Sequence, residues 1–418
     1  MAVLKQPLLQ MSLWAALAGV LTSLVVIAFR LSIETILGQG ILPKGHESFE
    51  ELRPINRFLL AFSGAALLGL IMSKIPPSSR ETGIAHVVKN TTNNKSKLPF
   101  ANAVYQFFGG IIALSTGQSG GREGPAIHLG STSSSLLAKF LGLSSVSAHT
   151  LVGCGAAAAI ASSFSTPIAG IIFAMEVLKI QYSLSSFVPI IMAATSATIA
   201  THILIGPNTT FIVPELFFNL VSGIPFVVMT GAIVGALAAS FVWSINKFSL
   251  KSFGGPLKRT TLAGFITGLS AMLVPQVMGI GYDTVGDSFI GGLTISSLVL
   301  ILLFKTLTSA AAFGLGLPVG LIGPTLVIGS CAGALLSSSI QYLGIGTEIS
   351  PALYAIVGMA AMMGAVLQAP LAALIAILEL TKNAAIILPS MIATVMAVLV
   401  MRTIFRQKGV FEKAHEDS

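Results

Sequence analysis

Gly121-Arg122-Glu123-Gly124-Pro125 is the stretch that decides the fold. It separates two apolar segments, residues 101–116 and 126–143. An unpaired charge in hydrocarbon costs several kcal/mol, so an adjacent guanidinium and carboxylate need a reason to be here. Pro125 suits the first position of a helix, where its missing N–H is no loss. A helix starting here would aim free N–H groups and a partial positive charge at one spot, which is typical of an anion site. Glu123 would compete with an anion for that site.

The composition predicts an all-α polytopic membrane protein. The chain has 418 residues, of which 54% are hydrophobic and 9% charged, and its mean hydropathy is +0.89. Soluble domains carry about 25% charged residues, so a soluble fold is excluded. The 42 glycines suit close helix packing in lipid. Cys154 and Cys331 lie in apolar segments and suggest neither a disulfide nor a metal site. We expect no cleavable signal, and no soluble domain after Ser418.

Charges in the first loops indicate the orientation. A first helix over residues 10–37 is followed by an acidic loop, and a span over residues 57–75 is followed by a basic one. The basic residues of the second loop are Lys74, Arg80, Lys89, Lys95 and Lys97. The positive-inside rule places this loop in the cytoplasm. Both termini are then expected there too, if the first helix lies along or dips into that face rather than crossing.

The chain repeats itself. Gly121-x-x-Gly124-Pro125 returns as Gly320-x-x-Gly323-Pro324, and the Pro167-Ile-Ala…Glu176-x-x-Lys179 segment returns as Pro370-Leu-Ala…Glu379-x-x-Lys382. We therefore predict two structural halves, and interrupted segments at equivalent positions point to a binding site between them. The predicted divisions are residues 1–205, residues 210–404 and a C-terminal tail of residues 405–418. The spacing leaves open whether the halves are parallel or inverted.

Two such helix starts favour an anion site over simple helix packing. Backbone N–H groups carry no full positive charge, so they bind an anion weakly enough for it to leave again, as conduction requires. Glu81-Thr82-Gly83 is a weaker third candidate, for which plain N-capping by Thr82 is the simpler interpretation.

These residues together resemble the CLC family of chloride channels and chloride/proton antiporters, in its bacterial type without cytoplasmic CBS domains. Residues 121–125 match the family signature GREGP at all five positions. Residues 320–324 resemble GxFxP, with Ile322 for Phe, and Thr82-Gly83-Ile84 falls where the family has GSGIP, with Glu81 for the first Gly and Ala85 for Pro. The likeness extends to Lys408-Gly-Val-Phe411 and covers nearly the whole chain.

The resemblance implies inverted halves with broken and re-entrant helices, about eighteen helices, and a homodimer in the bacterial inner membrane with one pore per subunit. It implies that Glu123 is the outer gate of a chloride path, and that Thr82 and the N–H groups of Leu321 and Ile322 hold the ion. Arg122 would brace the loop rather than touch the ion. The full set of implied path residues is Thr82, Gly83, Arg122, Glu123, Gly124, Leu321, Ile322 and Phe411.

Two departures from the family pattern bear on mechanism. Phe411 aligns, with one inserted residue, to the tyrosine of the inner gate, and it cannot donate a hydrogen bond. Val177 falls where the antiporters commonly carry a proton-relaying glutamate. The neighbouring Glu176 has Lys179 one turn on, and Glu379 repeats this with Lys382. Spacing of i, i+3 predicts structural pairing rather than a relay.

These features favour a passive, voltage- or pH-gated chloride channel. A chloride/proton antiporter of the same family and a transporter of a larger anion such as sulfate remain alternatives. Intact GREGP argues against fluoride.

Other candidate sites are weak. We expect no enzyme activity and no cofactor, because no nucleophile–base pair or nucleotide motif is present. His86 and His128 are interpreted as packed or surface residues rather than metal ligands. Asp283 and Asp287 are predicted to lie in a turn between spans.

Overall fold

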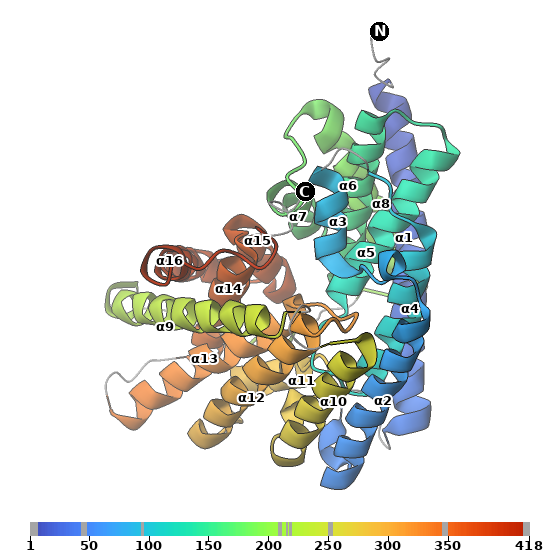
Figure 1. Cartoon of the computed structure of the whole chain (residues 1–418). Coiled ribbons are helices and arrows are strands. Elements are labelled where there is room, and N and C mark those ends of the chain that lie inside the picture. The colour runs from blue at the N-terminus through green and yellow to red at the C-terminus, as the bar shows by residue number, and fades with distance from the viewer. Residues whose placement is uncertain are drawn as a thin grey trace.

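A computed structural model describes residues 7–42, 48–92, 96–207, 211–214, 216, 220–249, 254–344 and 350–412. Lys95 of the basic loop and residues 413–418 of the predicted tail lie outside these ranges. The described residues form sixteen α-helices and no strand, which confirms the all-α prediction. Figure 1 shows α1 to α8 gathered on one side and α9 to α16 on the other.

The helices differ in length. In the first part they are α1 Leu8–Ile36, α2 Pro54–Lys74, α3 Gly83–Thr92, α4 Phe100–Ser115, α5 Glu123–Phe140, α6 Ser145–Phe164, α7 Pro167–Glu176 and α8 Leu184–Leu204. In the second part they are α9 Leu220–Lys247, α10 Pro256–Leu273, α11 Tyr282–Phe289, α12 Ile295–Gly314, α13 Ile322–Tyr342, α14 Pro351–Leu367, α15 Pro370–Thr381 and α16 Ile387–Leu399. Short π segments at Leu37–Ile41 and Val400–Ile404 extend α1 and α16.

The molecule is built for a bilayer. Eight helical segments of the described chain are long and apolar enough to cross one. Large apolar side chains such as Leu9, Ile203 and Leu303 are more than half exposed, as expected where lipid replaces water. In contrast, α7 and α15 have 10 and 12 residues. At 1.5 Å per residue they fall far short of a hydrocarbon core of about 30 Å, so neither can cross the bilayer by itself.

Local sequence explains where these short helices begin. Ser165 and Gln368 adopt left-handed backbone angles, with φ of 56° and 54°, and end α6 and α14. A proline then opens the next helix, Pro167 in α7 and Pro370 in α15. Proline at the first helical position loses no hydrogen bond. The same break therefore occurs at equivalent places in the repeated segments.

Glycine contacts let the central helices pack closely. Gly130 of α5 faces Gly155 of α6, and Gly329 of α13 faces Gly358 of α14. A side chain at any of these positions would meet the backbone of the facing helix. Such contacts are typical of helices packed in lipid, and here they hold α5 and α13, which carry the site.

Candidate functional site

The two glycine-proline motifs meet backbone to backbone. The N–H of Gly121 donates to the carbonyl of Gly320, and the N–H of Gly320 donates to the carbonyl of Gly121, both at 2.7 Å. This reciprocal pair is the antiparallel bridge found among the described residues. It brings together the starts of α5 and α13, which are almost 200 residues apart in sequence.

Each motif starts its helix two residues before the proline. The helix α5 begins at Glu123 and α13 at Ile322, so Pro125 and Pro324 are third residues. The prediction that Pro125 is the first residue is therefore wrong. The proline is still tolerated, because the first four N–H groups of a helix have no partner within it. Both helix starts, with their partial positive charge, lie at the Gly121–Gly320 bridge.

Glu123 is completely buried at this meeting point. Its Oε1 accepts a hydrogen bond from the hydroxyl of Tyr282, the first residue of α11. Its Oε2 has no hydrogen-bond partner among the described groups and lies near Gly323, at the start of α13. A carboxylate thus occupies the place between two helix N-termini where the sequence predicts an anion.

Tyr282 is a residue that sequence reasoning missed. The segment with Asp283 and Asp287 forms the helix α11 rather than the predicted turn. Gly281, with φ of 86°, precedes this helix and sets the direction of the tyrosine. The sequence holds no local signal for this contact, because the partner Glu123 is 159 residues away.

Arg122 contacts Glu34 and the Tyr282 ring. Its Nη1 lies 3.3 Å from the Glu34 carboxylate of α1, which also accepts from Arg30 at 2.6 Å. Its guanidinium carbon lies 5.7 Å from the centroid of the Tyr282 ring. The arginine therefore steadies both α1 and the tyrosine that holds Glu123.

A buried cation supports the same segment from behind. Lys305 of α12 has no exposed surface, and its Nζ donates to the carbonyls of Val277 at 3.2 Å and Gly279 at 3.0 Å. The N–H of Gly279 in turn donates to the carbonyl of Gly117 at 3.2 Å. Lys305, which the sequence reading also missed, fixes the approach to Tyr282 and adds positive charge near the site.

The side chain of Gln106 links the start of α3, next to Thr82, to the segment that precedes α13. The helix α3 begins at Gly83, whose N–H donates to Gln106 Oε1 at 2.8 Å. The Nε2 of Gln106 donates to the carbonyl of Pro318 at 2.9 Å, just before α13. Among the described residues, no hydrogen bond joins Thr82 itself to Ile322. Its part in holding an ion stays a prediction.

The remaining predicted path residues divide into two groups. Gly124 packs against Gly320, and Leu321 and Ile322 are almost fully buried at the start of α13. Phe411 is also buried, but it belongs to the C-terminal segment, where Val410 donates to the carbonyl of Val366 at 3.0 Å. The role of Phe411 as an inner gate therefore remains a prediction.

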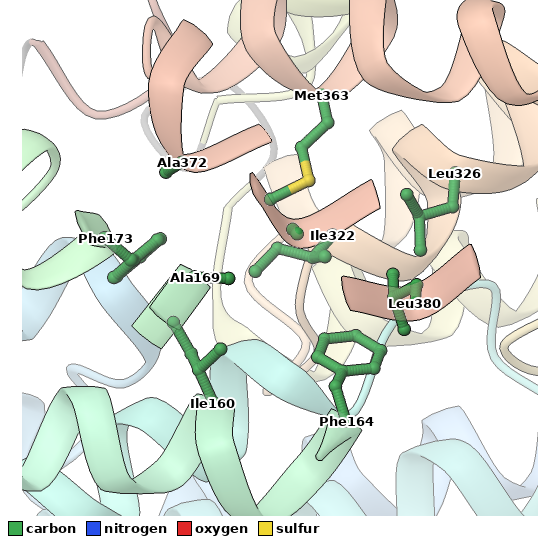
Figure 2. A pocket seen from close by; sticks show the side chains of 10 residues that line it. Ile160, Phe164, Ala169, Phe173, Ile322, Leu326, Met363, Ala372 and Leu380 are labelled. Atoms are coloured by element: carbon green, nitrogen blue, oxygen red, sulfur yellow. The ribbon is translucent and has the colours of Figure 1, made fainter. Parts of the chain in front are cut away.

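A narrow cavity borders Ile322 between α6, α7, α13, α14 and α15. Figure 2 shows its lining, in which Phe164, Phe173 and Met363 surround the Ile322 side chain. The full lining is Ile160, Phe164, Ala169, Phe173, Ile322, Leu326, Met363, Ala372, Ala376 and Leu380. Every lining side chain is hydrocarbon except for one thioether. None of them can carry a proton.

Glu176 and Glu379 have a structural role, with partners other than those predicted. The Glu176 carboxylate accepts from the N–H groups of Leu371 at 3.2 Å and Ala372 at 2.7 Å, and so caps α15. The Glu379 carboxylate accepts from Ile168 at 3.1 Å and Ala169 at 2.7 Å, and so caps α7. The predicted pairing with Lys179 and Lys382 is replaced by this exchange of caps. Both lysines instead adopt left-handed backbone angles, with φ of 55° and 51°.

The sequence suggested that His86 and His128 are unrelated residues, but in the structure they contact each other. The Nδ1 of His86 and the Nε2 of His128 lie 2.8 Å apart and share a hydrogen bond between α3 and α5. Both side chains are buried. The described residues contain no group of three potential metal ligands, and Cys154 and Cys331 are free and buried.

The fold and this site define an all-helical membrane protein with a buried carboxylate at the meeting point of two helix N-termini. The chain belongs to the Voltage gated chloride channel family, whose sequence model matches residues 64–402. The resemblance to the CLC family is thereby confirmed.

Relatives and solved structures extend the likeness to nearly the whole chain. An H(+)/Cl(-) exchange transporter ClcA of Yersinia pseudotuberculosis is 27% identical over 410 residues, covering 95% of this chain and 85% of that protein. One of Vibrio parahaemolyticus is 29% identical over 356 residues, covering 82% and 74%. The structure of a slow cyanobacterial Cl−/H+ antiporter superposes with a TM-score of 0.84 at 22% identity, covering 99% and 98%. A CLC-type fluoride/proton antiporter gives 0.78 at 22%, covering 97% of each.

These relatives correct one expectation. The sequence reading favoured a passive channel because Val177 lacks a carboxylate. The similar proteins are instead named as proton/chloride exchange transporters. The channel prediction is therefore wrong, because an unprotonatable residue at one position does not exclude a proton path elsewhere.

Proposed function

We propose that this protein exchanges chloride for protons across the membrane. The observation that carries the proposal is the Glu123 carboxylate, buried between the starts of α5 and α13 and hydrogen-bonded to Tyr282. The relatives are named for chloride and protons, and the match covers most of the length of each relative. These names support the choice of chloride and protons.

Competition for one position explains the coupling. An ionised Glu123 has the charge and the oxygen atoms of an anion, so it fills the space at the two helix N-termini. Protonation removes that charge, so the side chain is no longer attracted to the N–H groups at the helix N-termini. Chloride can then enter, and a proton has moved onto Glu123. Each exchange of chloride and carboxylate therefore accompanies a proton transfer.

Purified protein in liposomes tests the exchange. Under opposed chloride and pH gradients, the reversal potential of an exchanger lies between the chloride and proton equilibrium potentials. We expect a downhill chloride gradient to drive protons uphill. A reversal potential at the chloride equilibrium value would contradict the proposal. Sulfate and fluoride efflux measured in the same vesicles would show whether a different anion is the substrate.

The Glu123→Gln variant tests the gate. Glutamine has nearly the shape of the protonated acid and cannot release a proton. We expect chloride efflux to continue, without its pH dependence and without proton movement. We expect the rate of proton transport to fall by at least about a hundredfold, the contribution typical of a general acid–base group. A folded variant that conducts no chloride would contradict the assignment.

The assembly and placement belong to the same proposal. We infer a homodimer with one path in each subunit, in the inner membrane, with both termini in the cytoplasm. Cross-linking in native membranes and accessibility labelling of cysteines placed at Lys97 and Arg402 test these points.

A further inference from the structure

We propose that Glu81, His86 and His128 form a proton route from the aqueous surface to the interior of the protein beside α5. The proposal rests on the exchange function above and supplies its proton side. Its basis is a chain of three titratable side chains that runs from an exposed carboxylate to a fully buried imidazole.

The middle of the route is the histidine pair. His86 lies in the first turn of α3, and His128 lies in α5, five residues after Glu123. Their Nδ1 and Nε2 atoms are 2.8 Å apart. One nitrogen must donate and the other must accept, so a proton already lies on the line between the rings. The exposed fraction is 6% for His86 and 0% for His128.

The outer end reaches water through Glu81. The Glu81 side chain is 45% exposed, and its Oε2 lies 3.7 Å from His86 Nε2. Its Oε1 accepts from Lys89 Nζ at 2.7 Å. Glu81 and Lys89 are the side chains that interact electrostatically with His86. His86 is the side chain that interacts electrostatically with His128. The carboxylate therefore lies between solvent and the buried ring.

The inner end has an unused nitrogen. His128 Nδ1 is buried and has no hydrogen-bond partner among the described groups. Five residues of helix span about 7.5 Å along the axis and about 140° around it, so His128 and Glu123 do not lie on the same face of α5. The proposed route therefore includes bridging water molecules that carry the proton from His128 Nδ1 to Glu123.

Each transfer along the route conserves charge. The carboxyl proton of Glu81 passes to His86 Nε2, and His86 Nδ1 releases its proton to His128 Nε2. His128 Nδ1 then releases a proton to water, which passes one to the Glu123 carboxylate. An imidazole can do this because it accepts at one nitrogen and donates from the other. Each ring is left neutral in its second tautomer, and the first tautomer is restored when water takes the proton from Nε2 and returns one to Nδ1.

Among the described residues around the Ile322 cavity, no other chain of proton-binding side chains is present. The cavity in Figure 2 is lined by side chains that bind no proton. Glu176 and Glu379 are engaged as helix caps. His149 is partly exposed on α6 and contacts Ser96 at 3.4 Å, away from the pair. His149 is for this reason a suitable control.

The experiment compares proton and chloride fluxes of His128→Gln with those of the unmodified protein and His149→Gln. Glutamine keeps a hydrogen-bonding group but cannot pass a proton. In His128→Gln we expect proton flux to fall by about tenfold or more, with chloride flux within about twofold. The reversal potential should move to the chloride equilibrium value. His149→Gln should behave as the unmodified protein does.

A second variant separates a relay from a structural pair. Steps in series are not additive, so His86→Gln combined with His128→Gln should lose no more proton flux than either alone. Unchanged coupling in His128→Gln would overturn the route, and so would an equal loss of both fluxes. If the unmodified protein moves no protons, the exchange function itself fails; if it does and His128→Gln does too, only the route fails.

Discussion

The hydroxyl of Tyr282 donates to the Glu123 carboxylate, and this contact favours the ionised form over the protonated form. Hydrogen bonds to charged groups contribute about 1.5–3 kcal/mol, which corresponds to roughly one to two pH units. In Tyr282→Phe the ionised form of Glu123 loses this donor, so Glu123 should protonate at higher pH. We expect the pH of half-maximal chloride efflux to rise by about one unit, measured from efflux rates across a pH series.

A buried tyrosine without this contact provides the control. Tyr105 is 4% exposed, and its hydroxyl has no hydrogen-bond partner among the described groups. Tyr105→Phe removes the same atom and should leave the pH profile in place. An equal shift in both variants would mean that Tyr282 acts through packing alone.

Single residues were predictable where their local sequence was distinctive. Glu123 was placed at a helix start because glycines and a proline surround a charge in an apolar context. Its partner Tyr282 and the His86–His128 pair were not predictable, since the partners are 159 and 42 residues apart. Neither pair leaves a periodic pattern in the chain.

At the level of elements, α7 and α15 each depend on a carboxylate from the other. Removing an N-terminal cap costs about 0.5–2 kcal/mol. We expect Glu379→Gln to lower the free energy of unfolding by about 1 kcal/mol, because an amide is a weaker acceptor than a carboxylate. Thermal unfolding in detergent measures it, and Glu176→Gln should give a similar loss.

Lys179→Gln distinguishes this exchange of caps from local pairing. If Glu176 paired mainly with Lys179, the lysine variant would be as damaging as the carboxylate variant. The structure predicts a change within about 0.5 kcal/mol, as for an ordinary surface substitution. The repeated Glu-x-x-Lys pattern correctly indicated a structural role, but spacing can reveal only neighbours on the same helix.

At the level of the whole molecule, the Gly121–Gly320 bridge sets how the two motifs meet. A Cβ on Gly320 would lie 2.7 Å from the Gly124 nitrogen and 3.0 Å from the Gly121 oxygen. These are backbone atoms and cannot turn aside. We expect Gly320→Ala to lower the free energy of unfolding by about 1–3 kcal/mol, and to reduce chloride efflux as the helix starts separate.

Gly286 is the matched control. It lies in α11, and a Cβ there would meet nothing within 4 Å. Gly286→Ala should keep full efflux and raise stability by about 0.5–1 kcal/mol, since alanine is the better helix former. Normal efflux in Gly320→Ala would show that the close approach at the bridge is dispensable.

The overall class was readable from the chain, and the transport mode was not. Composition, the repeated motifs and the breaks at Pro167 and Pro370 predicted an all-helical membrane protein with an anion site. Whether protons move depends on a connected path, which one position such as Val177 cannot decide. A path made of side chains from α3 and α5 becomes visible only when the helices are placed together.

The exchanged caps also constrain how the protein is made. The N–H of Ile168, at the start of α7, donates to Glu379, which the ribosome adds 211 residues later. At about 5–20 residues per second, that delay is roughly 10–40 s. The nascent first part therefore enters the bilayer with N–H groups that no translated residue yet satisfies, and the insertion machinery or lipid headgroups must hydrogen-bond them until Glu379 has been added.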